Sequence, residues 1–155
     1  QNAYLLLVGS PVFNNDRHYK HLKQLIQKYD VKDFVIMPGY RVDLQNMFSA
    51  MDFFVFPSKE KDTSPLALLS AISAGLPVAV SNIESLIEII ELCPFVDVFE
   101  HRNWEELVSL MEKYENEEIR KVNGIKNREA GKQYFDISSH SEKMLSIFKK
   151  LLDLS

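Results

Sequence analysis

The stretch PSKEKDTSPLALLSAISAGLPV, residues 57–78, carries the most structural information in this chain of 155 residues. An apolar run at Phe53–Phe56 precedes it and ends at Pro57. After a polar loop, the pattern predicts a helix over Leu66–Ala74 that Gly75 closes. A further apolar run begins at Val78. The segment therefore predicts the order strand, loop, helix, strand.

The start of this helix is a candidate anion site. Ser64 occupies the N-cap position, and Pro65 suits the first turn because its missing N–H would be unpaired there. Free N–H groups and the helix dipole at such a start favour a phosphate group. A capped helix that binds no ligand is the alternative. The residues alone leave both interpretations open.

The same alternation of strands and helices extends along the whole chain. Strands are predicted at Tyr4–Val8, Phe34–Met37, Phe53–Phe56, Val78–Val80 and Val96–Phe99, and further helices at Asp16–Tyr29, Asp43–Ala50, Glu84–Leu92, Trp104–Tyr114, Glu117–Ala130 and Ser138–Leu152. The strands are continuous apolar runs, which is typical of strands buried on both faces. We therefore expect an α/β fold with a Rossmann-like, doubly wound parallel sheet in one domain. Ligands of such sheets bind beyond the carboxyl ends of the strands, which selects the loops 9–15, 39–42, 58–65 and 81–85.

Composition narrows the class of protein. The formal net charge of −4 argues against a nucleic-acid partner, and no run reaches the roughly 20 apolar residues of a membrane span. The single Cys93 excludes an internal disulfide and is interpreted as a packing residue in a reducing compartment. His18 and His21 are interpreted as a solvated helix face, and no Asp-x-Asp occurs, so no metal site is predicted. Because Gln1 is not a start residue, we expect the true N-terminus to lie further upstream.

The stretch 57–78 resembles the signature of a large family of retaining, two-domain GT-B glycosyltransferases, the family-four-like glycosyl transferases group 1. This family includes sucrose synthases and many bacterial polysaccharide and lipid glycosyltransferases. The residues in register are Pro57, Ser58, Ala71, Gly75, Pro77 and Val78 in the stretch, with Gly39, Asp43 and Asp52 before it and Glu88-Ile89-Ile90 after it. The resemblance covers nearly the whole chain.

The resemblance implies a function for residues 1–155 as a single domain that binds a nucleotide-sugar. The donor would be a UDP- or GDP-sugar, UDP being favoured, and transfer would retain the anomeric configuration without metal or cofactor. The family's first strand–helix unit and its N-terminal acceptor domain would lie outside this chain, so the chain alone is expected to be inactive. The acceptor would be a glycan or a lipid-linked sugar. The expected location is cytoplasmic, with peripheral membrane contact of the full-length enzyme as a further option.

The resemblance also implies roles for individual residues. Asp62 stands where the family has the carboxylate beside the donor sugar, and Ser70 stands where a second carboxylate accepts hydrogen bonds from the ribose. The remaining donor-binding candidates are Gly9, Ser10, Tyr40, Arg41, Thr63, Ser64, Pro65 and Leu66. Two alternatives stay open: Gly9-Ser10 could be a simple turn, and Arg41 could pair with Asp43 and do nothing else.

The departures from the family pattern support a rival hypothesis. Asp62 is one carbon shorter than the family's Glu, Ser70 lacks the charge, and Asn82-Ile83-Glu84-Ser85 replaces a Gly-Gly pair. A degenerate, non-catalytic nucleotide-binding or assembly module is therefore the alternative, and a nucleotide-sugar epimerase ranks last. The apolar stripe of the final helix (Met144, Leu145, Ile147, Phe148, Leu151 and Leu152) is interpreted as core-docking, with a membrane-surface helix as the second interpretation.

Overall fold

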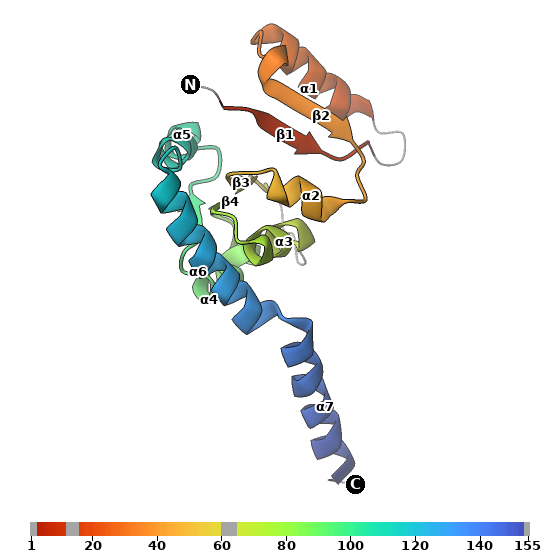
Figure 1. Cartoon of the computed structure of the whole chain (residues 1–155). Coiled ribbons are helices and arrows are strands. Elements are labelled where there is room, and N and C mark those ends of the chain that lie inside the picture. Colours follow the sequence, from red (N-terminus) through yellow and green to blue (C-terminus); the bar gives the residue numbers. More distant parts are fainter. Residues whose placement is uncertain (1–2, 12–15, 60–64, 154–155) are drawn as a thin grey trace. The chain divides into compact units, whose positions relative to one another are not determined.

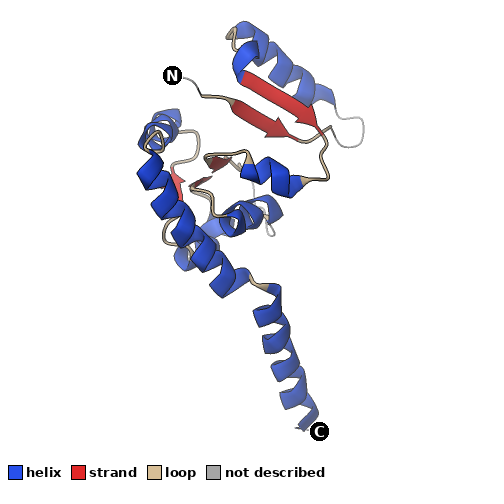
Figure 2. Cartoon of the chain, in the orientation of Figure 1, coloured by secondary structure: helices blue, strands red, loops and turns tan. Residues whose placement is uncertain are grey.

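The computed structural model describes residues 3–11, 16–59 and 65–153 (Figure 1). Helices and parallel strands alternate through most of the chain, so the expected α/β class is confirmed (Figure 2). The chain divides into two compact units, residues 1–50 and 51–155.

The first unit contains a pair of parallel strands. Its elements are β1 (Leu5–Val8), α1 (Asp16–Lys28), the 3-10 helix η1 (Lys32–Phe34), β2 (Val35–Gly39) and α2 (Leu44–Ser49). β1 and β2 pair in parallel, with Leu5 opposite Val35 and Val8 opposite Gly39. The expected burial on both faces is wrong for these strands, because Leu5 is 54% and Ile36 49% exposed.

The second unit contains three parallel strands in the order β3-β4-β5. Its elements are β3 (Phe54–Phe56), α3 (Leu66–Ala74), β4 (Val78–Ser81), the 3-10 helix η2 (Glu84–Leu86), α4 (Ile87–Leu92), β5 (Asp97–Phe99), α5 (Trp104–Lys113), α6 (Glu117–Phe135) and α7 (Ile137–Asp153). All four residues of the central strand β4 are buried. Among the described residues, hydrogen bonds join the strands in two sets, β1-β2 and β3-β4-β5, where the sequence had predicted one sheet.

Helix α6 packs tightly against the end of α3. Gly75 ends α3 in the left-handed conformation, at φ 80°. A Cβ atom on Gly124 of α6 would lie 2.2 Å from the carbonyl oxygen of Gly75, so the two backbones approach too closely for a side chain. The buried Asn127 donates to the Leu76 carbonyl at 2.8 Å, and Arg128 donates to the Ala74 carbonyl at 2.8 Å. These contacts fix the turn between α3 and β4.

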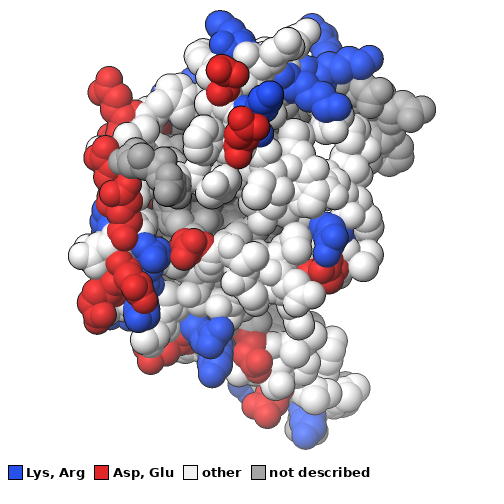
Figure 3. Space-filling view, turned by 45° about the horizontal axis from the view of Figure 1, so that its top comes forward, with Lys and Arg blue, Asp and Glu red and all other residues white. Residues whose placement is uncertain are grey.

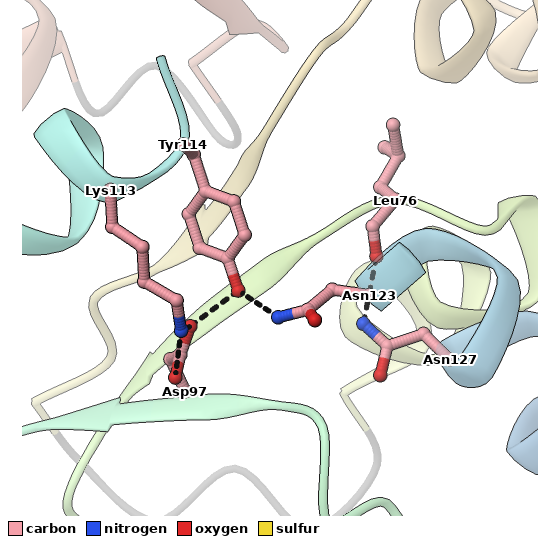
Figure 4. A network of polar contacts seen from close by, with 6 residues as sticks. All are labelled: Leu76, Asp97, Lys113, Tyr114, Asn123 and Asn127. Carbon is pink, nitrogen blue, oxygen red and sulfur yellow. Dashed lines mark hydrogen bonds and ion pairs between the residues drawn. The ribbon is translucent and has the colours of Figure 1, made fainter. Parts of the chain in front are cut away.

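A polar network ties α5 and α6 to the start of β5 (Figure 4). Lys113 forms an ion pair with Asp97 at 2.7 Å, and the Tyr114 hydroxyl donates to the same carboxylate. Asn123 donates to the Tyr114 oxygen at 2.7 Å. Burial, helped by the hydrogen bond with Asp97, raises the pKa of the Tyr114 hydroxyl above its usual range. Because Asp97 begins β5, this network lies at the amino end of the strand, away from the edge where ligands bind.

Two predictions from the sequence concern the burial of the C-terminal helix α7 and of Cys93. The apolar stripe of α7, from Met144 to Leu152, is between 39% and 72% exposed, so the core-docking interpretation is wrong for the described chain. Cys93 is fully buried, as its packing interpretation predicted, and burial raises its pKa to about 11. Within residues 3–11, 16–59 and 65–153, no helix is long and apolar enough to cross a membrane.

Candidate functional site

The carboxyl ends of β1 and β2 lie side by side in the first unit. Val8 is opposite Gly39, and the Gly9 N–H donates to the Gly39 carbonyl at 2.9 Å. Gly9 and Gly39 have φ values of 143° and 77°, which a residue with a side chain rarely adopts. The expected meeting of these two loops is therefore confirmed. Ser10 and Tyr40, which follow these two glycines in the sequence, are exposed at that edge.

Arg41 is engaged with Asp43. Its guanidinium donates to both carboxylate oxygens, at 2.8 and 2.6 Å, and Asn46 donates to the same carboxylate at 3.3 Å. The hydrogen bond from Arg41, with a smaller contribution from Asn46, lowers the pKa of Asp43 to about 2. This pairing is the alternative that the sequence left open. The donor-binding role of Arg41 stays a prediction, and with the guanidinium held by Asp43 that role would belong to its backbone groups.

The carboxyl ends of β3 and β4 meet in the second unit. Ser81, which is 1% exposed, donates from its hydroxyl to the Ser58 carbonyl at 2.6 Å. Beside it, Asn82 donates from its backbone to the Phe99 carbonyl at 2.8 Å and from its side chain to Glu100 at 3.2 Å. The expected neighbours Ser58 and Ser81 are thus confirmed within this unit. Sequence reasoning missed the Asn82–Glu100 pair, although Glu100 directly follows one predicted strand and Asn82 lies two residues after another.

Helix α3 is the element that follows β3 in the sequence, and its N-cap lies one residue later than predicted. Pro65, not Ser64, is the N-cap, and it forms no side-chain capping bond. Asp62, Thr63 and Ser64 lie outside the described residues, so their roles stay predictions. Among the described residues, the first backbone hydrogen bond of the helix runs from the Leu69 N–H to the Pro65 carbonyl at 3.0 Å. The three N–H groups before it therefore have no intrahelical acceptor among the described residues.

Leu66 and Ser70 share the face of α3 that points away from the core. Leu68, Ala71 and Ile72 are fully buried on the opposite face. Leu66 is 70% exposed, and Ser70, one turn later, is half-buried. A ligand at the helix start could therefore reach Ser70 along this face. The ribose role of Ser70 stays a prediction.

A pocket of about 200 Å³ lies beside the start of α3. It is lined by Pro65, Leu69, Ser85, Glu88, Ile89, Leu92 and Phe135, which come from α3, η2, α4 and the end of α6. Of these residues, the sequence predicted only Pro65 as a donor-binding residue; Ser85 lay in a loop expected at the ligand side of the sheet, and Glu88 and Ile89 matched the family motif. No sequence pattern places Phe135 next to residues about 70 positions earlier. In the part of the chain that the structure describes, no group of three or more His, Cys, Asp or Glu could hold a metal ion.

A sequence model of the family described as glycosyl transferases group 1 matches residues 1–132. The chain belongs to this family. The resemblance drawn from residues 57–78 is therefore confirmed. Among curated members, it is similar to the UDP-Gal:α-D-GlcNAc-diphosphoundecaprenol α-1,3-galactosyltransferase of Escherichia coli, with 35% identity over 82 residues. That alignment covers 53% of this chain and 20% of the galactosyltransferase.

Solved structures show that the glycosyltransferase fold extends over nearly the whole chain. HepE of Anabaena, in complex with UDP, superposes with a TM-score of 0.88 at 18% identity, over 96% of this chain and 41% of HepE. The C-terminal domain of the glycosyl transferase group 1 family protein LpcC from Francisella tularensis superposes with a TM-score of 0.74 at 14% identity, over 86% of this chain and 70% of that domain. The chain thus spans less than half of the HepE chain.

Proposed function

We propose that this glycosyltransferase-family chain is a donor-binding domain that holds a nucleotide-sugar for transfer to a glycan or a lipid-linked acceptor. The observation that carries the proposal is the start of α3. Its N–H groups follow the carboxyl end of β3, and Leu66 is exposed there. Family membership supports sugar transfer, and the match to a C-terminal domain supports a position in a longer enzyme.

The nucleotide diphosphate would bind at this helix start. Free N–H groups and the positive end of the helix dipole favour the negative charge that develops on the leaving diphosphate. Asp62 would lie near the donor sugar, and Ser70 would lie near the ribose. UDP is the favoured nucleotide, because HepE is solved with UDP. Retention of configuration and independence of metal belong to the same proposal.

The acceptor would be bound by the part of the enzyme outside this chain. Transfer would then take place in a cleft to which this domain contributes the donor. The Escherichia coli relative is named for an acceptor on a diphosphoundecaprenol lipid, which supports a lipid-linked acceptor and peripheral membrane contact on the cytoplasmic side. A cytoplasmic enzyme also fits a chain whose one cysteine is buried and reduced.

A degenerate module that senses nucleotide or assists assembly is the second candidate. Two observations favour it: Ser70 cannot supply the charge of a carboxylate, and Arg41 is already paired with Asp43. Both features weaken donor binding but leave the helix start of α3 intact. Nucleotide binding is therefore expected of a donor-binding domain and of a nucleotide sensor, whereas a module that only assists assembly need not bind nucleotide.

Thermal unfolding of the full chain with UDP, GDP, ADP and their sugars tests the site. A specific ligand at a hundredfold excess over its Kd stabilises the fold by about 2.7 kcal/mol. Leu66→Asp places a negative charge at the first residue of α3. This change favours the helix dipole but repels a diphosphate. Ile137→Asp makes the same change at the exposed first residue of α7 and serves as the control.

We expect a uridine nucleotide to stabilise the wild type and Ile137→Asp but not Leu66→Asp. Equal stabilisation of both variants would move the binding site away from the start of α3. If none of the nucleotides stabilises the wild type, the donor-binding proposal fails and an assembly role becomes the better interpretation.

A further inference from the structure

The outward face of α1 is basic between Arg17 and Lys28, after the helix begins at Asp16. Arg17, Lys20, Lys23 and Lys28 are all exposed, and no Asp or Glu occurs between residues 17 and 28. At 100° per residue the four cations fall within an arc of about 140°, and they extend over about 16 Å along the helix. Leu22, Leu25 and Ile26 lie on the other face and are half-buried.

The four cations are available for an external partner. Among the described residues, none of them forms an ion pair; the pairs that exist involve Arg41, Lys113, Arg120 and Lys121. Two of them lie over aromatic rings: the Nζ of Lys23 is 4.5 Å from the ring centre of Tyr19, and the Nζ of Lys28 is 5.3 Å from that of Tyr29. Tyr29 is itself 64% exposed. Lysines beside exposed tyrosine rings are typical of segments that lie at a membrane surface.

The charge of the chain is divided unevenly along the sequence. Residues 1–50 contain six Lys or Arg and four Asp or Glu, whereas residues 51–155 contain twelve and eighteen. Figure 3 shows Lys and Arg side chains gathered over α1. A local cationic surface on an otherwise acidic chain attracts an anionic partner by charge complementarity.

We propose that the outward face of α1 docks on an anionic lipid surface. The partner is a membrane because a row of exposed cations with the exposed Tyr29 at its end suits the plane of charged lipid headgroups. The inference assigns to α1 the membrane contact that is part of the proposed function. It rests on that proposal only for the existence of such a contact. It assigns the contact to α1, which has four exposed cations between residues 17 and 28, in preference to α7, whose polar face has three, Lys143, Lys149 and Lys150.

Sedimentation of the full chain with lipid vesicles tests the proposal. One set of vesicles contains phosphatidylglycerol and phosphatidylcholine in equal parts, and the other contains phosphatidylcholine alone. The test variant is Lys20→Gln/Lys23→Gln on α1, and the matched control is Lys149→Gln/Lys150→Gln on α7, which removes the same charge. Each Lys near an anionic membrane strengthens binding about five-fold, so the α1 variant should bind about twenty-five-fold more weakly.

We expect binding to the anionic vesicles alone, loss of that binding at high salt, and a much smaller effect of the α7 control. Thermal unfolding with nucleotide on the same samples should be unchanged by the α1 variant. Three results would overturn the proposal: no binding of the wild type to anionic vesicles, equal losses in the two variants, or tighter binding to a DNA duplex than to vesicles. If nucleotide stabilisation persists in any of these cases, only the docking surface is lost and the donor-binding proposal stands.

Discussion

Ser70 decides how well the proposed site can hold a ribose. It lies one turn after Leu66 on the face of α3 that points away from the core. A carboxylate there could accept two hydroxyl hydrogen bonds, and charged hydrogen bonds contribute roughly 1.5–3 kcal/mol against about 1 kcal/mol for neutral ones. A serine is too short for this and reaches the ribose at best through water. The residue thus favours weak nucleotide binding.

We therefore expect Ser70→Glu to tighten binding of the ribonucleotide by about one to two powers of ten. The gain should shrink for the 2′-deoxy analogue, which lacks one of the hydroxyls. Calorimetry of the wild type and the variant with both nucleotides measures the difference. Because Ser70 is half-buried on the outer face, a glutamate there can reach solvent and should not disrupt the fold. Unchanged or weaker affinity would show that α3 does not present this position to a ribose.

At the scale of elements, the contact between α3 and α6 should be the least tolerant of change. We expect Gly124→Ala to destabilise the fold by about 1–3 kcal/mol, because its Cβ would lie 2.2 Å from the Gly75 carbonyl oxygen and the two helices would have to separate. Alanine has a higher helix propensity than glycine, so a loss of stability would have to come from the packing contact. Urea unfolding measures it, with the exposed Glu129→Ala on the same helix as the control. A variant as stable as the control would contradict this contact.

The elements also show what the sequence could predict. The bounds of α3 agree with the prediction, because Gly75 closes the helix in a conformation that glycine adopts readily. Its N-cap was predicted one residue early, because serine is favoured at the N-cap and proline at the first helical position, whereas here Pro65 is the N-cap. Helix α6 was predicted to end at Ala130, five residues before its observed end at Phe135. The boundary is marked by Asp136, which caps the following helix α7 by accepting from the backbone N–H groups of Ser138 and Ser139. The Tyr114–Asp97 contact was missed because local patterns do not specify which distant polar groups meet.

At the scale of the whole molecule, the proposed function assigns this chain one part of a larger catalytic arrangement. Its fold matches 41% of the HepE chain, and its candidate residues are those expected to hold a donor. In the second unit, the helix-start N–H groups and Ser70 are proposed to bind a nucleotide; in the first unit, Arg41 is paired with Asp43. An acceptor must be positioned against the donor sugar by other groups. We therefore expect this chain to bind a nucleotide-sugar but not to turn it over.

The final prediction is that the chain of 155 residues binds a nucleotide-sugar without transferring the sugar. Positioning two reactants in one site can lower a barrier by about 7–11 kcal/mol, and the chain alone would lack the acceptor half of that contribution. Radiolabelled donor sugars incubated with lipid-linked and glycan acceptors measure transfer, and thermal unfolding on the same samples verifies that donor is bound. The full-length enzyme is the positive control. Transfer by the chain alone at a rate near that of the full-length enzyme would show that residues 1–155 already position both substrates.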